Sequence, residues 1–203
     1  MVGKGGLSMP ATSVQKLAKV LKILVTITFI CNLTALPLVA GLSRLRGVTE
    51  LLGGIGYFSA QGEGMPVVAA RMSAYFLTSW IEIWQLSEQY AQVLTLFLLF
   101  CGVCTAVTLW QARRVLNTIL AGVPFQNANG ISLRRAAVCC FLISAAALVR
   151  LLWGFWYYAS IQPLLTYNAL FVPIFFMGGL LCLVMSALFR QAAELKAEND
   201  LTI

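Results

Sequence analysis

Four apolar runs separated by polar connections are the feature that most constrains this chain. They lie at residues 23–42, 91–109, 136–156 and 170–189, and Arg150 is the only charged residue inside them. An α-helix rises about 1.5 Å per residue, so about twenty residues cover the roughly 30 Å hydrocarbon core of a bilayer. The whole chain has 60% hydrophobic and only 10% charged residues. The polar sequence outside the four runs is therefore too short to form a separate soluble domain. The pattern predicts an all-α integral membrane protein in which residues 1–203 form a single domain of four transmembrane helices.

The lysines and arginines indicate the orientation of these helices. Ten of them fall before the first run, in 110–135 and in the tail 190–203, whereas three fall in the connection 43–90. Basic residues next to membrane spans are retained on the cytoplasmic side. We therefore expect both termini and the 110–135 connection to be cytoplasmic. The same residues carry the net charge of +7, and we expect no direct nucleic-acid binding because there is no recognition-type basic helix.

The first run is predicted to be a retained anchor, with a cleaved signal peptide as the alternative. Val39, Ala40 and Gly41 offer small residues for cleavage, but signal peptides have apolar regions of only about 7–15 residues. Within this run, Asn32 predicts a hydrogen bond to another helix and Pro37 predicts a kink.

The connection 43–90 is predicted to place an amphipathic helix at the outer membrane interface. Its second half separates polar from apolar side chains at helical spacing: Arg71, Thr78, Glu82, Gln85 and Gln89 against Met72, Phe76, Trp80, Ile83 and Trp84. Such a helix lies flat, with tryptophans at headgroup depth. A structural lid and a ligand-sensing surface both fit this pattern.

The connection 110–135 is predicted to be a helical hairpin. Apolar residues continue the second span at helical spacing as far as Leu120, and Gly122 and Pro124 end it. Residues 127–130 have turn chemistry, and the next helix is expected from residue 131. Beyond the fourth span, the helix is expected to continue into an acidic tail. Within that span, Gly178, Cys182 and Ser186 predict a small-residue face for close helix packing.

The residues that could carry chemistry argue against an enzyme. The chain has no histidine, the commonest general base and metal ligand, so we predict no catalytic, cofactor or metal site. All six cysteines fall inside apolar runs, so no disulfide framework is expected, and Cys101 and Cys104 are interpreted as small apolar residues. Arg150 is a candidate because charges inside spans are costly. It could pair with Glu82 or Glu88, extend toward the outer surface, or bind a substrate.

Two stretches near the predicted cytoplasmic face together match the pattern of a known family. The first contains Ile119, Leu120, Ala121, Gly122, Pro124, Phe125, Asn129, Leu133, Arg134 and Arg135, and the second contains Glu194, Leu195, Lys196 and Glu198 through Ile203. Together they resemble the bacterial family known as domain of unknown function 2975, best from Trp110 onward. The connection 43–90 departs from the family pattern. The resemblance implies a four-span protein of the bacterial cytoplasmic membrane without known enzymatic activity. Genes of such proteins often neighbour one for a small Cro/C1-type helix-turn-helix regulator.

We therefore expect a non-enzymatic signalling protein that tethers or modulates such a regulator. The expected partner surface consists of Arg113, Arg114, Pro124, Phe125, Arg134, Arg135, Glu194, Glu198 and Asp200. The loop and the tail could instead pair with each other, or the arginines could bind lipid phosphates. The alternative function is an oligomeric transporter or channel component for an anion or lipid, with Arg150 as its charged residue. A homo-oligomer is compatible with both functions.

Overall fold

The computed structural model describes residues 13–44, 53, 64–85, 89–123, 125–159 and 167–201. Its long helices are α1 (Ser13–Ala35), α5 (Gln89–Leu120), α6 (Asn127–Tyr158) and α7 (Phe171–Leu201). With the short elements that extend α1, they give four helices long and apolar enough to cross a membrane, and the described residues form no strand. The prediction of an all-α, four-span membrane protein is confirmed.

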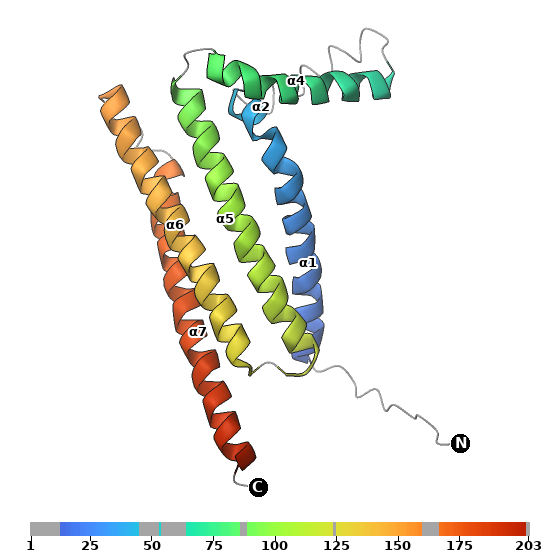
Figure 1. The fold of residues 1–203 in the computed structure, drawn as a ribbon, viewed down its shortest axis with the longest axis vertical. Coiled ribbons are helices and arrows are strands. Elements are labelled where there is room, and N and C mark those ends of the chain that lie inside the picture. The colour runs from blue at the N-terminus through green and yellow to red at the C-terminus, as the bar shows by residue number, and fades with distance from the viewer. Residues whose placement is uncertain are drawn as a thin grey trace.

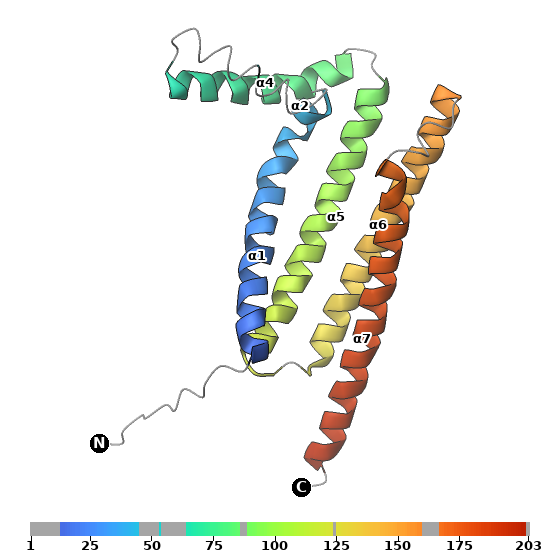
Figure 2. The ribbon, with the colours of Figure 1, turned by 180° about the vertical axis from the view of Figure 1, so that it is seen from behind.

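The four long helices stand side by side in chain order (Figures 1 and 2). Helix α1 packs on α5, α5 on α6, and α6 most extensively on α7. Many large apolar side chains remain exposed along them, including Leu17 (71%), Leu181 (65%) and Val149 (66%). Apolar side chains exposed on membrane-spanning helices are suited to contact with lipid.

The two ends of this row of helices differ. Helix α1 begins and α7 ends at the end that holds the α5–α6 connection, hereafter the loop end (Figure 1). Helix α4 (Met65–Gln85) lies across the opposite end, hereafter the α4 end. Both ends of the helical chain therefore lie at one face of the row of helices. That this face is cytoplasmic stays a prediction.

The first span is bent as its sequence predicts. Helix α1 is followed by a 3-10 turn, η1 (Leu36–Leu38), which contains Pro37, and then by α2 (Val39–Arg44). Proline lacks an N–H and cannot continue the regular helical hydrogen bonding. Asn32 Nδ2 donates to the Gly102 carbonyl of α5 over 2.9 Å, so the predicted interhelical hydrogen bond is also confirmed.

Helix α4 is the predicted amphipathic helix. It buries Val68, Phe76, Ser79 and Ile83, and it packs on α2. The indole of Trp80 donates to the Pro37 carbonyl over 2.8 Å, which uses a polar group at the bend of the first span. Trp84 is 57% exposed. The prediction was wrong about Gln89, which begins α5 and does not continue the polar face of α4.

The end of α5 agrees with the prediction, but the start of α6 does not. Gly122 adopts φ +74°, a left-handed conformation that favours glycine, and Val123 N–H bonds the Thr118 carbonyl to close the helix. Helix α6 begins at Asn127, so residues 127–130 are helical and not a turn. The side chain of Asn129 is buried and donates to Thr118 Oγ1 over 2.7 Å. This contact with α5 outweighs the weak helix preference of the local sequence.

Helices α6 and α7 meet through small residues, with one shift from the predicted pattern. Ser186 Oγ donates to the Gly130 carbonyl over 2.7 Å, as a close-packed face requires. A Cβ at Gly179 would lie 2.8 Å from the Phe141 ring, whereas a Cβ at Gly178 would meet nothing within 4 Å. Gly179, not the predicted Gly178, is therefore the glycine that α7 contributes to this interface.

Candidate functional site

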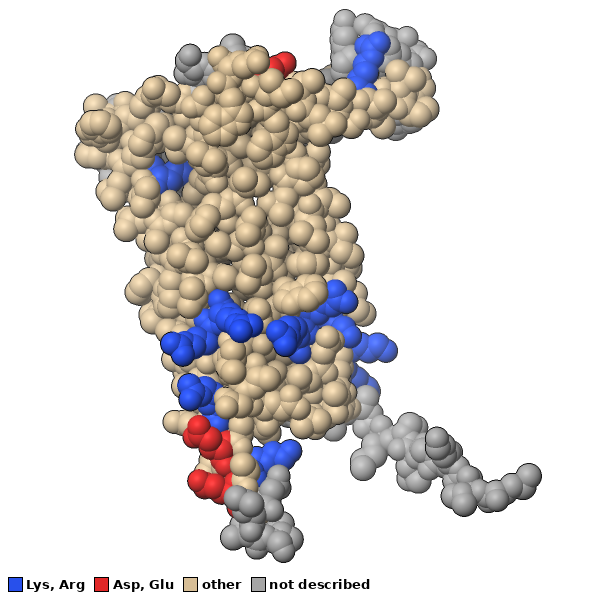
Figure 3. Space-filling view, in the orientation of Figure 1, with Lys and Arg blue, Asp and Glu red and all other residues tan. Residues whose placement is uncertain are grey.

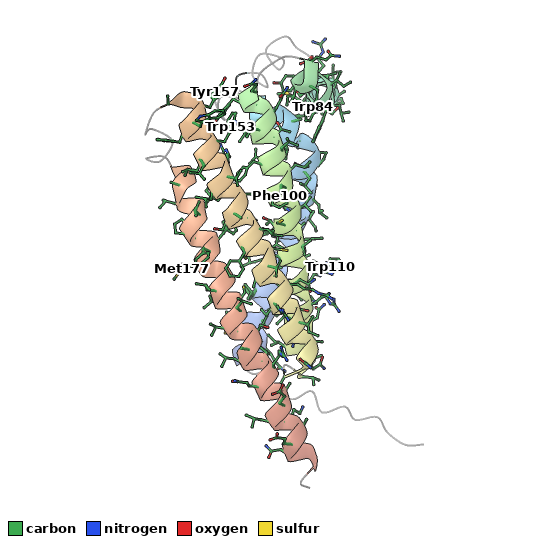
Figure 4. The ribbon with its side chains drawn as sticks, turned by 60° about the vertical axis from the view of Figure 1, so that its left-hand side comes forward. Trp84, Phe100, Trp110, Trp153, Tyr157 and Met177 are labelled. Carbon is green, nitrogen blue, oxygen red and sulfur yellow. The ribbon has the colours of Figure 1, made fainter. Side chains whose placement is uncertain are left out.

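Basic side chains gather near the loop end of all four long helices. Figure 3 shows them on the visible face as a band below the uncharged middle of the molecule. This basic belt is formed by Lys16, Lys19, Lys22, Arg113, Arg114, Arg134, Arg135 and Arg190, all exposed or half-buried. Trp110 of α5 is labelled toward this end in Figure 4, and its ring lies 5.9 Å from that of Phe29 on α1. Cations and a tryptophan at one level are typical of a membrane–water boundary.

The α5–α6 connection is attached to α7 just inside the start of the tail. The ring centroid of Phe125 lies 6.2 Å from that of Phe189. The aliphatic part of Arg190 crosses Gly130, where a Cβ would lie 2.6 Å from Arg190 Cγ. The structure therefore brings the predicted site residue Phe125 to the base of the tail. Pro124 lies outside the described residues.

The tail continues α7 beyond the other helices. Figures 1 and 2 show α7 projecting past the ends of its neighbours at the loop end. Glu194 and Glu198 are exposed, and Leu195 between them is 62% exposed. Asp200 lies in the last turn of the helix. The acidic side chains that Figure 3 shows at the loop end lie beyond the basic belt. The connection thus meets α7 through aromatic rings at the base of the tail, and the acidic residues of the tail lie farther along the helix than the basic belt.

Three residues at this end were not among the predicted site residues. Phe189 and Arg190 hold the connection against α7, and Leu195 places an apolar side chain among carboxylates. Their spacing offers a partial signal, since Arg190 follows Ser186 by four residues on the same helical face. Nothing in the sequence shows that Phe125 reaches Phe189, because that contact depends on how the connection folds back.

Arg150 lies on α6 far from the basic belt. Its guanidinium carbon is 4.7 Å from the centroid of the Phe97 ring on α5. In the part of the chain that the structure describes, this contact takes the place of the expected ion pair with Glu82. Glu88, the other expected partner, lies outside that part. The side chain is half-buried between two helices rather than fully enclosed.

The model of the family described as "Protein of unknown function (DUF2975)" matches residues 67–203. The chain belongs to this family. The match includes nearly all of α4, so the expectation that the chain departs from the family as far as residue 90 was wrong. No curated protein and no solved structure matches the chain.

Proposed function

We propose that this membrane protein of the DUF2975 family holds or modulates a small cytoplasmic helix-turn-helix regulator. It acts as a non-enzymatic signalling or tethering protein in the bacterial cytoplasmic membrane. The observation that carries the proposal is the projecting end of α7. It presents Glu194 and Glu198 with the exposed Leu195 between them, beyond the basic belt. A DNA-binding partner carries lysines and arginines for phosphates, and such groups also bind carboxylates.

The base of the tail is suited to hold this surface in place. Ser186 is hydrogen-bonded to Gly130, and Phe189 contacts Phe125, so α7 is attached to α6 and to the connection directly before the tail begins. A helix fixed at its base loses less freedom when a partner binds than an unstructured tail does. The basic belt supports a cytoplasmic loop end through the positive-inside rule.

The test is binding between the full-length protein in detergent or nanodiscs and a purified helix-turn-helix protein encoded beside it. We expect the charge-reversed variant Glu194→Lys/Glu198→Lys to lose binding, because repulsion replaces attraction. Lys196→Gln is the matched control, since it changes an exposed charge on the same turn without removing a carboxylate. DNA carrying the regulator's site should compete with the tail. Equal binding by the wild type and the charge-reversed variant would exclude the tail as the docking surface.

A second measurement separates tethering from mere contact. If the membrane protein modulates the regulator, expression from the regulator's own target promoter should change on deletion of residues 191–203. The same change should follow from Glu194→Lys/Glu198→Lys at an unchanged level of membrane protein. An unchanged promoter in both strains would refute a regulatory role even if binding were measured in vitro.

A further inference from the structure

Arg150 is a charged side chain inside a membrane-spanning helix, and the described residues give it no anionic partner. It is the only basic residue of the chain between Arg135 and Arg190. Its contact in the described part of the chain is an aromatic ring, with no carboxylate paired to it. A guanidinium carries five N–H donors, and a cation–π contact with a ring does not use them as hydrogen-bond donors to an oxygen.

The depth of Arg150 follows from its distance to the basic belt. Fifteen residues of continuous helix separate it from Arg135, which is about 22 Å along α6. If the belt marks one boundary of a hydrocarbon core roughly 30 Å thick, Arg150 lies within about two turns of the other boundary. A long arginine side chain can bridge that remainder toward the headgroups. Its charge is therefore placed near the phosphates of the leaflet at the α4 end.

Aromatic side chains lie beside Arg150 and further along α6 toward the α4 end. Phe97 of α5 lies below the guanidinium, and Trp153 and Tyr157 follow Arg150 by three and seven residues on the same face of α6. The rings of Trp153 and Tyr157 stack with centroids 5.0 Å apart and an interplanar angle of 17°. Figure 4 shows both side chains close to the α4 end of α6. A cation bordered by interfacial aromatic rings is suited to hold one polar headgroup.

We propose that Arg150, Phe97, Trp153 and Tyr157 form a binding seat for a phosphate group, supplied by an anionic phospholipid of the leaflet at the α4 end. Phosphate oxygens match the fork of guanidinium donors, which bind them in pairs. A lipid with a net negative charge is favoured over a zwitterionic one, because the seat has a fixed positive charge and no described carboxylate to accept an amine. This inference is independent of the regulator proposal, which concerns the opposite end of the molecule.

The test is lipid retention by the full-length protein. The protein is reconstituted in nanodiscs of equimolar phosphatidylglycerol and phosphatidylcholine, then released into mild detergent for native mass spectrometry. We expect the wild type to retain phosphatidylglycerol in preference to phosphatidylcholine. Arg150→Gln should lower the occupancy of the most tightly held phosphatidylglycerol about tenfold, the factor that corresponds to losing a charge-assisted hydrogen bond. Circular dichroism verifies that each variant remains helical.

Two further variants make the result specific to this seat. Phe97→Leu keeps the charge but removes the ring. Its phosphatidylglycerol occupancy should therefore lie between those of the wild type and Arg150→Gln. Arg135→Gln removes the same charge from the basic belt and should leave this lipid bound. Equal retention by the wild type and Arg150→Gln, or an equal loss from Arg135→Gln, would overturn the proposal.

Inorganic phosphate distinguishes a lipid from a soluble source of the same group. Retention of phosphatidylglycerol that excess inorganic phosphate does not lower supports the lipid. Displacement of that lipid by inorganic phosphate in the wild type overturns the lipid assignment, because the seat would then bind soluble phosphate from water.

Discussion

The interface between α6 and α7 and the interface between α1 and α5 are held by different means. At the first, Gly130 and Gly179 bring the helices close together, and Ser186 and Ser144 donate hydrogen bonds of 2.7 and 2.9 Å to carbonyls across the interface. At the second, Asn32 donates one hydrogen bond to Gly102, and Phe29 lies against Trp110. Lipid tails are as apolar as leucine, so close packing and hydrogen bonds, not hydrophobicity, hold such helices together.

The two interfaces also differ in the surfaces that their helices expose. Helix α7 bears the projecting tail, and its tight contact with α6 fixes the base of that tail. Helix α1 carries an exposed apolar surface, with Leu24 56% and Ile27 53% exposed, and it packs chiefly on α5. The family match at residues 67–203 includes both α6 and α7 and leaves α1 outside.

The largest expected effect comes from a larger side chain at Gly130, where α6 lies close to the backbone of α7. The α6–α7 interface is called the tight interface below, and the α1–α5 interface the loose interface. Gly130→Val would place a Cβ 3.1 Å from the Ser186 carbonyl oxygen, with two further methyl groups attached to it. The backbone of α7 cannot rotate away as a side chain can, so the helices must separate. We expect a loss of about 2 kcal/mol in the free energy of unfolding, measured by denaturation in mixed micelles. Binding of the regulator should weaken with it.

Gly178→Val is the control for this substitution. It adds the same atoms to a helix interior, but at a position with nothing within 4 Å of the new Cβ. Its effect should stay within about 0.5 kcal/mol. Equal losses from the two variants would show that helix propensity, and not the approach of α6 to α7, determines stability here.

The sequence was sufficient to predict the four spans, but not which residues face each other between neighbouring helices. The length of the apolar runs predicted four membrane helices, and Asn32 and Pro37 predicted a hydrogen bond and a bend that the structure contains. These are local properties, set by composition and by the chemistry of single residues. The shift from Gly178 to Gly179 was not predictable in this way. The rotation of α7 depends on the Phe141 ring of another helix, and adjacent glycines give no local signal that distinguishes them.

The same limit applies to the candidate sites. The arginines and the acidic tail could be assigned to one face from charge alone, whereas the contact of Phe125 with Phe189 depends on the path of the connection. Residues 127–130 were interpreted as a turn because asparagine and glycine favour turns, yet Asn129 bonds Thr118 on α5 and the helix begins earlier. For Arg150, opposite charge suggested a carboxylate partner, whereas the contact found among the described residues is with the Phe97 ring.

A smaller effect is expected from removing one hydrogen bond of the tight interface. Ser186 is 5% exposed, and Ser186→Ala deletes its hydroxyl donor to the Gly130 carbonyl. Hydrogen bonds between membrane helices contribute about 0.6 kcal/mol on average and up to about 1.7. We expect a loss of about 1 kcal/mol by the same unfolding measurement, because this bond is buried. Thr28→Ala, which removes a hydroxyl bonded only within its own helix, should have no measurable effect.

The smallest effect is expected at the loose interface, from Asn32→Leu. This change removes the single hydrogen bond from α1 to Gly102 but also removes an amide whose remaining polar atoms are unfavourable in lipid. The Gly102 carbonyl keeps its bond within α5, so no orphaned acceptor results. The lost hydrogen bond and the removal of an unfavourable polar group nearly cancel, so the free energy of unfolding should change by less than about 0.5 kcal/mol. Regulator binding should also be unchanged, since the tail lies on α7. A loss as large as that of Gly130→Val would show that α1 is as firmly held as α7, and the contrast between the two interfaces would not stand.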